Sequence, residues 1–526
     1  MRSTFAGFTT AQLGLRASQY GLNVTGQNIS NINTTGYTRQ VVDQISLNLK
    51  NAGRYATGVN VGHGVLVTGI SQVRDPYLDI RFRNEIGKVG EADVKLAGLK
   101  EIESILDEVA KDGIQSQLGD MMKMLQKLST NVSSKEFENM VKSSADSLTK
   151  FINQCAKQLE TVRENQEYNL TQVDIPEVNN ILSNIAELNK SIKDGQVNGN
   201  PALELIDQRN VLIDELASYV KIDVKYVPTK ISENLTIDEL QIDFVGANKT
   251  INLLDHAGHV NFEIPNGTTQ LNIVDSNGNP IKDATGNTIG ENIFSELTTG
   301  SLKASLELLN KSGEFDGDTN SFRGIGYYQQ MLDVFANKLA TTFNDINNAG
   351  LPAGTPPADL HDLFGSTDGG QINAKNICIA SGWANSKYGI TASVTSDGST
   401  PPSGANDNIL KMISAMQADQ EFIYGGTLPD PSDDITLFKG SFNEFISSLN
   451  STLGIDIKST GTLLDNHVSV AKEISNAKDA ISGVSLDEEG MNLLRYQKSY
   501  AAAARLMTTL DEALDTVINK MGIVGR

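Results

Sequence analysis

The fold is decided by a stretch near the carboxyl end of the chain, which reads LDEEGMNLLRYQKSYAAAARLMTTLDEALDTVINKM over residues 486–521. Apolar residues recur in it every seven positions, in two rows. The first row is Leu493, Tyr500, Met507, Leu514 and Met521, and the second is Tyr496, Ala503, Leu510 and Val517. Four unbroken heptads favour a coiled-coil helix over a long helix packed on a globular core. Ser485 and Glu488 form a capping-box pattern just before it.

A second seven-residue stripe lies at the amino end, where Phe8, Leu15, Leu22 and Ile29 alternate with polar positions. This spacing predicts an amphipathic helix. The polar run at residues 31–36 ends it, because Asn, Thr and Gly favour turns over helix interiors. Since each end of the chain carries an apolar stripe, we expect the two terminal helices to pair.

Between the two ends the pattern changes several times. Residues 37–82 read as extended, with β-prone pairs separated by glycines, and residues 85–221 carry helical periodicity. Residues 222–300 alternate apolar and polar positions between Asn/Gly turns, which predicts a β domain. Helical periodicity returns at 301–348 and again at 406–480, around a loop-rich segment at 349–405.

These segments predict a mainly α protein with an inserted β domain and nested, discontinuous domains. Residues 1–48 and 474–526 form a terminal coiled-coil region. Residues 49–221 and 301–473 form a long-helix bundle, and residues 222–300 form the β insertion at its tip. A chain of 526 residues exceeds one ordinary core, which agrees with several domains.

Charge and hydropathy exclude two classes of partner. The formal net charge is −21, from 43 basic and 64 acidic residues. Such an excess of acid opposes binding to nucleic acid and anchoring on an anionic membrane. The sequence contains no apolar run of about 18 residues that would span a bilayer, and its first residues lack an apolar signal-peptide core. Composition alone therefore indicates a cytosolic protein.

Patterns typical of catalysis or metal binding are missing from the sequence. It holds no HExxH, GxxxxGK[ST], GxSxG or CxxC motif. The run from Asp316 to Asn320 resembles the start of a calcium loop, but Ser321 and Tyr327 stand where that loop needs Gly and Glu. We therefore expect a polar loop there, no metal or other cofactor, and no enzymatic activity.

Two histidines and two cysteines are the remaining candidates for a metal site or a disulfide. His256 and His259 have a spacing that metal sites use, with Asp255 and Glu263 beside them, but no third ligand is specified, which favours surface turn histidines. Cys155 and Cys378 are the only cysteines and cannot form a disulfide framework. We expect two buried thiols.

Three motifs resemble a known family. Residues 26–37, GQNISNINTTGY, resemble a stretch shared by flagellar rod, hook and hook-associated proteins. Residues 482–489 and 492–500, SGVSLDEE and NLLRYQKSY, are similar to the end of the hook-associated protein 1 family, and residues 205–216, LIDQRNVLIDEL, also resemble its helical middle. The resemblance is specific over about the first 40 and last 45 residues.

This resemblance implies a structural, non-enzymatic subunit of the bacterial flagellum that joins hook to filament as a junction zone. The implied partners are the hook protein, hook-associated protein 3, further copies of the chain in a helical array, and a cytosolic export chaperone on the carboxyl-terminal helix. It also implies an extracellular location, reached through the flagellum-specific export apparatus without a cleaved signal peptide. The predicted assembly seam comprises Phe8, Leu15, Leu22, Ile29, Leu493, Tyr496, Tyr500, Met507, Leu510, Leu514, Val517 and Met521.

Two other functions agree less well with the sequence. One is another flagellar axial protein, a hook or distal rod subunit, but such proteins are mainly β between their ends, unlike the helical middle here. The other is a secreted adhesin or enzyme carried on a flagellar scaffold, with its active part in residues 222–300 or 349–405.

Overall fold

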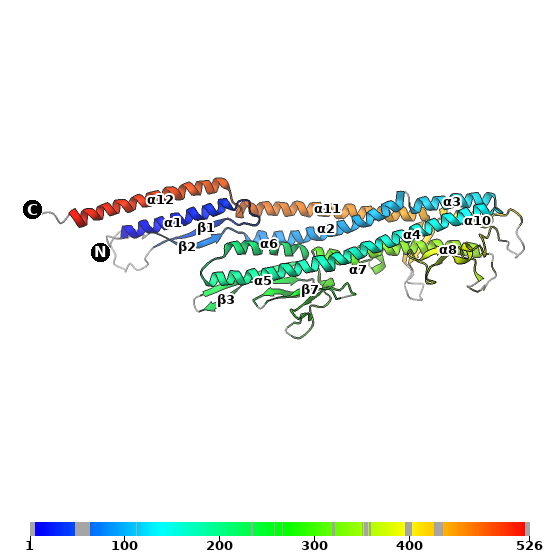
Figure 1. Ribbon diagram of the computed structural model, residues 1–526, viewed down its shortest axis with the longest axis horizontal. Coiled ribbons are helices and arrows are strands. Elements are labelled where there is room, and N and C mark those ends of the chain that lie inside the picture. Colours follow the sequence, from blue (N-terminus) through cyan, green and yellow to red (C-terminus); the bar gives the residue numbers. More distant parts are fainter. Residues whose placement is uncertain are drawn as a thin grey trace, which may run out of the picture.

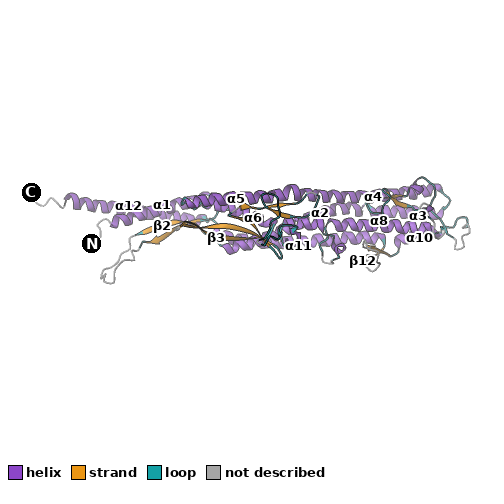
Figure 2. Ribbon diagram, turned by 90° about the horizontal axis from the view of Figure 1, so that it is seen from below, coloured by secondary structure: helices purple, strands orange, loops and turns teal. Residues whose placement is uncertain are grey.

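The protein is a long rod of helices with a small β domain on one side (Figures 1 and 2). The computed structural model describes residues 6–47, 64–111, 113–232, 235–256, 258–265, 267–283, 285–317, 321–349, 351, 356, 359–394, 402–424 and 435–520. Both chain ends lie at the same end of the rod, so the polypeptide runs out along the rod and returns. The prediction of a mainly α fold with a β insertion is confirmed.

The two terminal helices form one arm of the rod. Helix α1 (Ala6–Ser30) packs antiparallel against α12 (Leu486–Asp515), which continues as a π-helical turn at Thr516–Lys520. The predicted pairing of the two chain ends is therefore confirmed. Strands β1 (Gln40–Ser46) and β2 (Val65–Gln72) form an antiparallel ribbon beside α1. The prediction of an extended segment at 37–82 is correct for these strands and wrong from Pro76 onward, where helix α2 begins, while residues 48–63 lie outside the described part of the chain.

The rest of the rod is a bundle of long helices. Its helices are α2 (Pro76–Lys111), α3 (Ile114–Thr130), α4 (Lys135–Asn169), α5 (Ile175–Val197), α6 (Leu203–Tyr219), α7 (Ser301–Asn310), α8 (Ile325–Asn348), α10 (Asp407–Gln417) and α11 (Phe442–Ser482). Helix α11 begins with a complete capping box between Ser441 and Glu444. It runs unbroken past the expected boundary at 474, so the bundle meets the terminal arm at residues 483–485.

Helices α4 and α5 are one continuous rod joined by a π-helical turn, Leu170–Asp174. Its cause is Pro176, whose ring nitrogen has no hydrogen to donate to the preceding turn. The N–H of Ile175 instead donates to the carbonyl of Leu170, five residues back. The buried face consequently moves from Leu170 to Ile175, while Val173 between them is 53% exposed.

The β insertion lies on the flank of the bundle and not at its tip, which corrects the predicted position (Figure 1). Strands β3 (Ile222–Ser232), β4 (Leu235–Val245), β5 (Thr250–Asp255) and β6 (Gly258–His259) form an antiparallel sheet in sequence order. Strands β7 (Asn261–Glu263) and β8 (Asn272–Val274) form a second ribbon. Asn179 of α5 hydrogen-bonds both backbone groups of Phe262, at 2.9 and 2.7 Å, and so fixes the insertion to the bundle.

The far end of the rod differs from the sequence prediction in detail. The segment expected to be loop-rich contains the ribbon of β9 (Phe364–Ser366) and β10 (Ile377–Ile379) and a short helix, α9 (Ser381–Ala384). The segment 406–480, expected to be helical, also contains a hairpin of β11 (Gln420–Tyr424) and β12 (Ile435–Gly440). Phe422 of this hairpin is fully buried against Phe442 and Phe445 of α11, because aromatic rings fill the space where the two elements meet.

Candidate functional site

The terminal arm is held together by glycines that face side chains of the partner helix. A methyl group added at Gly7 would lie 3.1 Å from Leu510, at Gly14 3.7 Å from Ala503, and at Gly21 2.5 Å from Tyr496. These contacts recur every seven residues on both helices and keep one antiparallel register. The glycines let the two backbones approach closely, so that Leu510 and Tyr496 sit directly on the surface of α1.

The glycine row is not the stripe that the sequence predicts on α1. Phe8, Leu15 and Leu22 each follow one of these glycines by one residue, and these three and Ile29 are half-buried. The fully buried side chains of α1 include Ala11, Ala17 and Val24. Sequence reasoning missed the glycines because glycine is normally read as a weak point of a helix. Their seven-residue recurrence is the signal that could have identified them.

The predicted seam residues of α12 divide into two groups. Tyr496, Met507, Leu510 and Leu514 are half-buried, whereas Leu493, Tyr500 and Val517 are exposed. Met521 lies outside the described residues. The structure thus brings Tyr496 and Leu510 onto α1. The three solvent-facing seam residues come from both predicted rows, so the structure divides the seam differently from the sequence pattern. Its role as an assembly seam stays a prediction.

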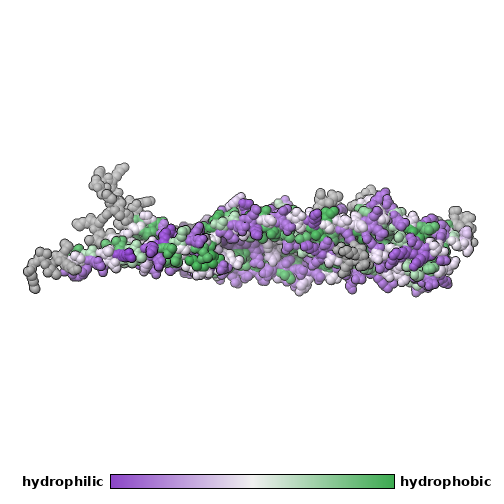
Figure 3. Space-filling model, turned by 90° about the horizontal axis from the view of Figure 1, so that it is seen from above, coloured by the Kyte–Doolittle hydropathy of each residue, from purple (hydrophilic) through white to green (hydrophobic). Residues whose placement is uncertain are grey.

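Several large apolar side chains of the terminal arm remain exposed after α1 and α12 have packed together. Apart from Leu486 at the start of α12, the exposed large apolar side chains of α1, α12 and the π-helical turn after it are Tyr20, Met491, Leu493, Leu494, Tyr500, Leu506, Val517 and Ile518. Apolar surface gathers along this arm and near its junction with the bundle (Figure 3). Exposed apolar side chains gathered on one part of a protein are typical of a protein–protein contact, and we call these eight residues the arm patch.

The turn after α1 is organised around one buried amide, the side chain of Asn28. The Asn28 side chain donates to the carbonyl of Gln40 at 2.9 Å and accepts from the Gln40 N–H at 3.0 Å. It also accepts from the Tyr37 hydroxyl at 2.9 Å. Burial, reinforced by Glu204, Asp207 and Glu489, raises the pKa of Tyr37, so its hydroxyl remains a donor at neutral pH. Asn28 therefore ties the end of α1 to the start of β1.

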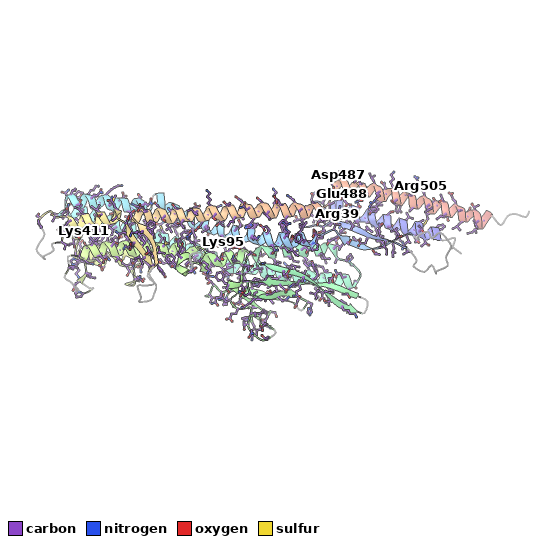
Figure 4. All side chains as sticks on the ribbon, turned by 180° about the vertical axis from the view of Figure 1, so that it is seen from behind. Arg39, Lys95, Lys411, Asp487, Glu488 and Arg505 are labelled. Carbon is purple, nitrogen blue, oxygen red and sulfur yellow. The ribbon has the colours of Figure 1, made fainter. Side chains whose placement is uncertain are left out.

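The next two residues connect the arm to the bundle. The Thr38 N–H donates to Asp207 Oδ2 on α6 at 3.0 Å, and the Arg39 N–H donates to the carbonyl of Ser482 at 2.8 Å. The Arg39 guanidinium pairs with Glu488 of α12 at 2.5 Å (Figure 4). Three elements distant in sequence thus meet at Thr38 and Arg39, and we call this contact region the joint.

Beneath the joint, a buried ion network holds the base of the bundle. Asp79 of α2 binds Arg74 at 2.5 Å and Lys478 of α11 at 3.0 Å. Lys478 also binds Asp214 of α6 at 2.9 Å, and Asp214 binds Arg83 at 2.6 Å. Burial opposes ionisation of Asp79, but Arg74 and Lys478 outweigh it and lower the pKa of that carboxyl. The network links three helices at the point where the arm begins.

No group of three or more His, Cys, Asp or Glu side chains in the described part of the chain is arranged to hold a metal ion. His256 lies in the turn after β5, and His259 lies in β6, paired with Leu254 of β5. Of the calcium-like run, Asp318, Thr319 and Asn320 fall outside the described residues, while Asp316 accepts hydrogen bonds from Ser312 and Ser321. Cys155 is buried and Cys378 half-buried, so the expectation of two buried thiols holds for Cys155 only, and neither forms a disulfide within the described residues. None of the described helices is long and apolar enough to cross a bilayer.

Comparisons with known proteins give concordant matches. Residues 99–361 match the family model described as the flagellar hook-associated protein FlgK helical domain. Residues 480–521 match the model described as the flagellar basal body rod FlgEFG protein C-terminal. The first match covers half of the chain, and the second covers all of α12.

Among similar proteins is flagellar hook-associated protein 1 of Bacillus subtilis (strain 168), which is 29% identical with 100% of both chains covered. The protein of the same name from Escherichia coli (strain K12) is 25% identical, with 97% of this chain and 98% of that one covered. A solved structure, the flagellar hook junction protein FlgK from Burkholderia pseudomallei, is 18% identical with a TM-score of 0.36. It covers 53% of this chain and 46% of its own, a similarity too distant to support an argument.

Proposed function

Because this chain belongs to the family of the flagellar hook-associated protein FlgK helical domain, we propose that it is a structural subunit that joins the flagellar hook to the filament. It acts by contact between subunits and not by catalysis. The observation that carries the proposal is the arm patch, whose apolar side chains have no cover within the described chain. Burial of such a patch stabilises an assembly by about 25 cal/mol for each Å² removed from water.

In the proposed assembly, copies of the chain lie side by side in a helical array and the arm patch of one copy contacts the arm of the next. Contacts of this kind are heterologous, since a screw axis brings different faces together. The hook protein lies on one side of the array and hook-associated protein 3 on the other. The helical bundle, which the joint and ion network hold to the arm, then lies outside the ring of arms.

Before export, the carboxyl-terminal helix binds a cytosolic chaperone. Helix α12 offers the stripe of Leu493, Tyr500, Met507 and Leu514, which has the spacing of a helix that lies in an apolar groove. The chain then leaves through the flagellum-specific export apparatus without a cleaved signal peptide, and α12 exchanges the chaperone for its neighbours in the array.

The arm patch can be tested without disturbing the fold. In the double variant Leu494→Asp, Leu506→Asp, two exposed apolar side chains become charged, so burial against a neighbour costs several kcal/mol (roughly 2–3 per unpaired charge). We expect a loss of motility and release of unattached filament protein into the medium. The control Gln497→Asp, Thr509→Asp changes exposed polar positions of the same helix. Normal motility in the first variant, with the protein present at the flagellum, would contradict the proposal.

A further inference from the structure

A pocket of about 440 Å³ lies between the β insertion and the bundle. Its walls come from α5, α6, β4 and the turn between β5 and β6. Ile237 and Leu240 form part of an apolar wall, and Arg209, Asn189 and Lys190 supply polar groups. The turn histidine His256 also lines it. None of the residues that line this pocket belongs to the terminal arm, so the proposed function makes no use of it.

Arg209 is the most unusual residue of this pocket. Its side chain is only 4% exposed, yet no carboxylate of the described chain lies within ion-pair distance of it. Nη1 donates to Asn189 Oδ1 at 2.8 Å, and the guanidinium carbon lies 5.8 Å from the centre of the Tyr226 ring. The buried Nε has no hydrogen-bond partner. A buried charge with no opposite charge beside it is costly, and Tyr226, which hydrogen-bonds the guanidinium, compensates it only in part.

Two other arginines near the base of the bundle are each paired with a carboxylate, unlike Arg209. Arg74 pairs with Asp79 at 2.5 Å, and Arg83 pairs with Asp214 at 2.6 Å. Burial lowers the pKa of Arg209, Tyr226 opposes that effect, and the charges of Arg74 and Arg83 add to it. The surroundings of Arg209 therefore favour the arrival of a negative charge.

The other charges of the pocket limit what that anion can be. Lys193 is held by Glu239 at 2.5 Å, and Asp194, Asp238 and Asp255 also line the pocket. These carboxylates would repel a phosphate dianion strongly, because it carries two negative charges. A single carboxylate carries one charge and can pair with the guanidinium of Arg209. A ligand with a short apolar stem would also cover Ile237 and Leu240.

We propose that the pocket binds one carboxylate group, held by Arg209 and by the free amide hydrogens of Asn189. The carboxylate comes either from a small free acid or from a Glu or Asp side chain of a second copy of this chain. A guanidinium–carboxylate pair is charge-assisted and strong when it is removed from water. Lys190, which also lines the pocket, adds a second positive charge.

The test uses the full-length chain and sodium butyrate as the probe, followed by saturation-transfer difference NMR. We expect a saturable signal on the butyrate methyl group, reduced at least tenfold in Arg209→Met, which keeps the buried stem and removes the charge. The matched control Arg81→Met removes an exposed arginine of α2 and should leave the signal unchanged. Sodium phosphate at the same ionic strength should not displace butyrate.

If Arg209→Met lacks a cooperative melting transition, Asn189→Ala replaces it, with an expected loss of several-fold in affinity. Sedimentation equilibrium separates the two sources of the carboxylate. Self-association that is weakened both by butyrate and by Arg209→Met identifies an acidic side chain of a second copy, and unchanged association identifies a free acid. Absence of a saturable signal in the native chain, or an equal signal in Arg209→Met, overturns the proposal.

Discussion

Gly21 of α1 lies directly beneath the ring of Tyr496 of α12, with no room for a single methyl group between them. An added Cβ would be 2.5 Å from Tyr496 Cδ1 and Cε1 and 2.7 Å from Cγ. Because Cγ is the first atom of the ring, the whole ring would have to move, and not only its far end. The contact fixes both the register and the spacing of the two terminal helices.

We therefore expect Gly21→Ala to separate α1 from α12. Overpacking of this kind costs about 1–3 kcal/mol, which exceeds the gain of up to about 1 kcal/mol in helix propensity. Amide hydrogen exchange should become faster in both terminal helices and stay unchanged in the bundle. The control is Gly26→Ala in the same helix, where an added methyl meets nothing within 4 Å. Slower exchange in Gly21→Ala would show that the ring moves aside freely.

The ion network around Asp79 predicts a loss of stability in acid. The folded pKa of Asp79 lies below its ordinary value of 3.8, so the folded state favours the ionised form. That contribution is fully present well above pH 3.8 and is lost as the pH falls through 3.8 toward the lower folded value. Urea unfolding measured at pH 7 and in steps down to pH 3 should show this loss.

In Asp79→Asn, Arg74 and Lys478 keep their charges without this partner, which should cost about 3 kcal/mol at neutral pH. The variant should also lose part of the acid dependence between pH 5 and 3. Asp43→Asn, in the ribbon of β1 and β2 and outside the network, provides the control. Equal acid dependence in the native chain and in Asp79→Asn would contradict the assignment.

The joint should depend more on Asp207 than on Glu488. The Glu488 side chain is 57% exposed, and an exposed ion pair contributes about 0–1 kcal/mol, so Glu488→Gln should leave the arm in place. Asp207→Ala removes the buried acceptor of the Thr38 N–H, which leaves that donor without its partner. We expect the arm to become mobile only in Asp207→Ala.

Spin labels at Ser469→Cys and Thr509→Cys, in a background with Cys155 and Cys378 replaced by alanine, report the angle between α11 and α12. The distance distribution should be narrow in the native background and in Glu488→Gln, and broad in Asp207→Ala. A broad distribution in Glu488→Gln alone would assign the joint to the surface ion pair.

The β insertion should be removable as a unit. Its two ends meet, since a Cβ on Gly300 would lie 2.1 Å from the carbonyl oxygen of Tyr219. Replacing residues 222–299 with two glycines should keep the helical circular dichroism and the length of the rod in small-angle scattering. The melting temperature should fall, because α5 loses its contacts with Phe262 and the sheet. A loss of helical signal would show that the insertion is part of the folding core of the bundle.

The sequence predicted those helices and strands whose hydrophobic pattern lies within one element, and it failed where contacts between distant residues decide the structure. The heptads from Leu493 onward predicted α12, and the alternation around Ile242 and Phe244 predicted the β insertion, because both patterns arise within single elements. The position of the insertion on the flank follows from contacts between Asn179 and Phe262, which are 83 residues apart. No local pattern contains that information.

The hairpin at Gln420–Tyr424 and Ile435–Gly440 was missed for a related reason. Its strands are short, and the buried Phe422 becomes a core residue only when Phe442 and Phe445 of α11 arrive. The joint could not be predicted from the sequence either, because only the tertiary fold brings Thr38 and Arg39 to Asp207 and Ser482.

The π-helical turn at Leu170–Asp174 has a consequence for how this rod can diverge among relatives. The i→i−5 hydrogen bond accommodates one extra residue without breaking the helix. The apolar stripe after the turn is therefore rotated about the helix axis relative to the stripe before it. The buried faces of α4 and α5 therefore point in different directions, although the two helices form one continuous rod. A substitution that twists or repacks the half bearing the β insertion need not turn the half that packs against α3 and α8, so the flank of the molecule is free to change while the far end of the rod is kept.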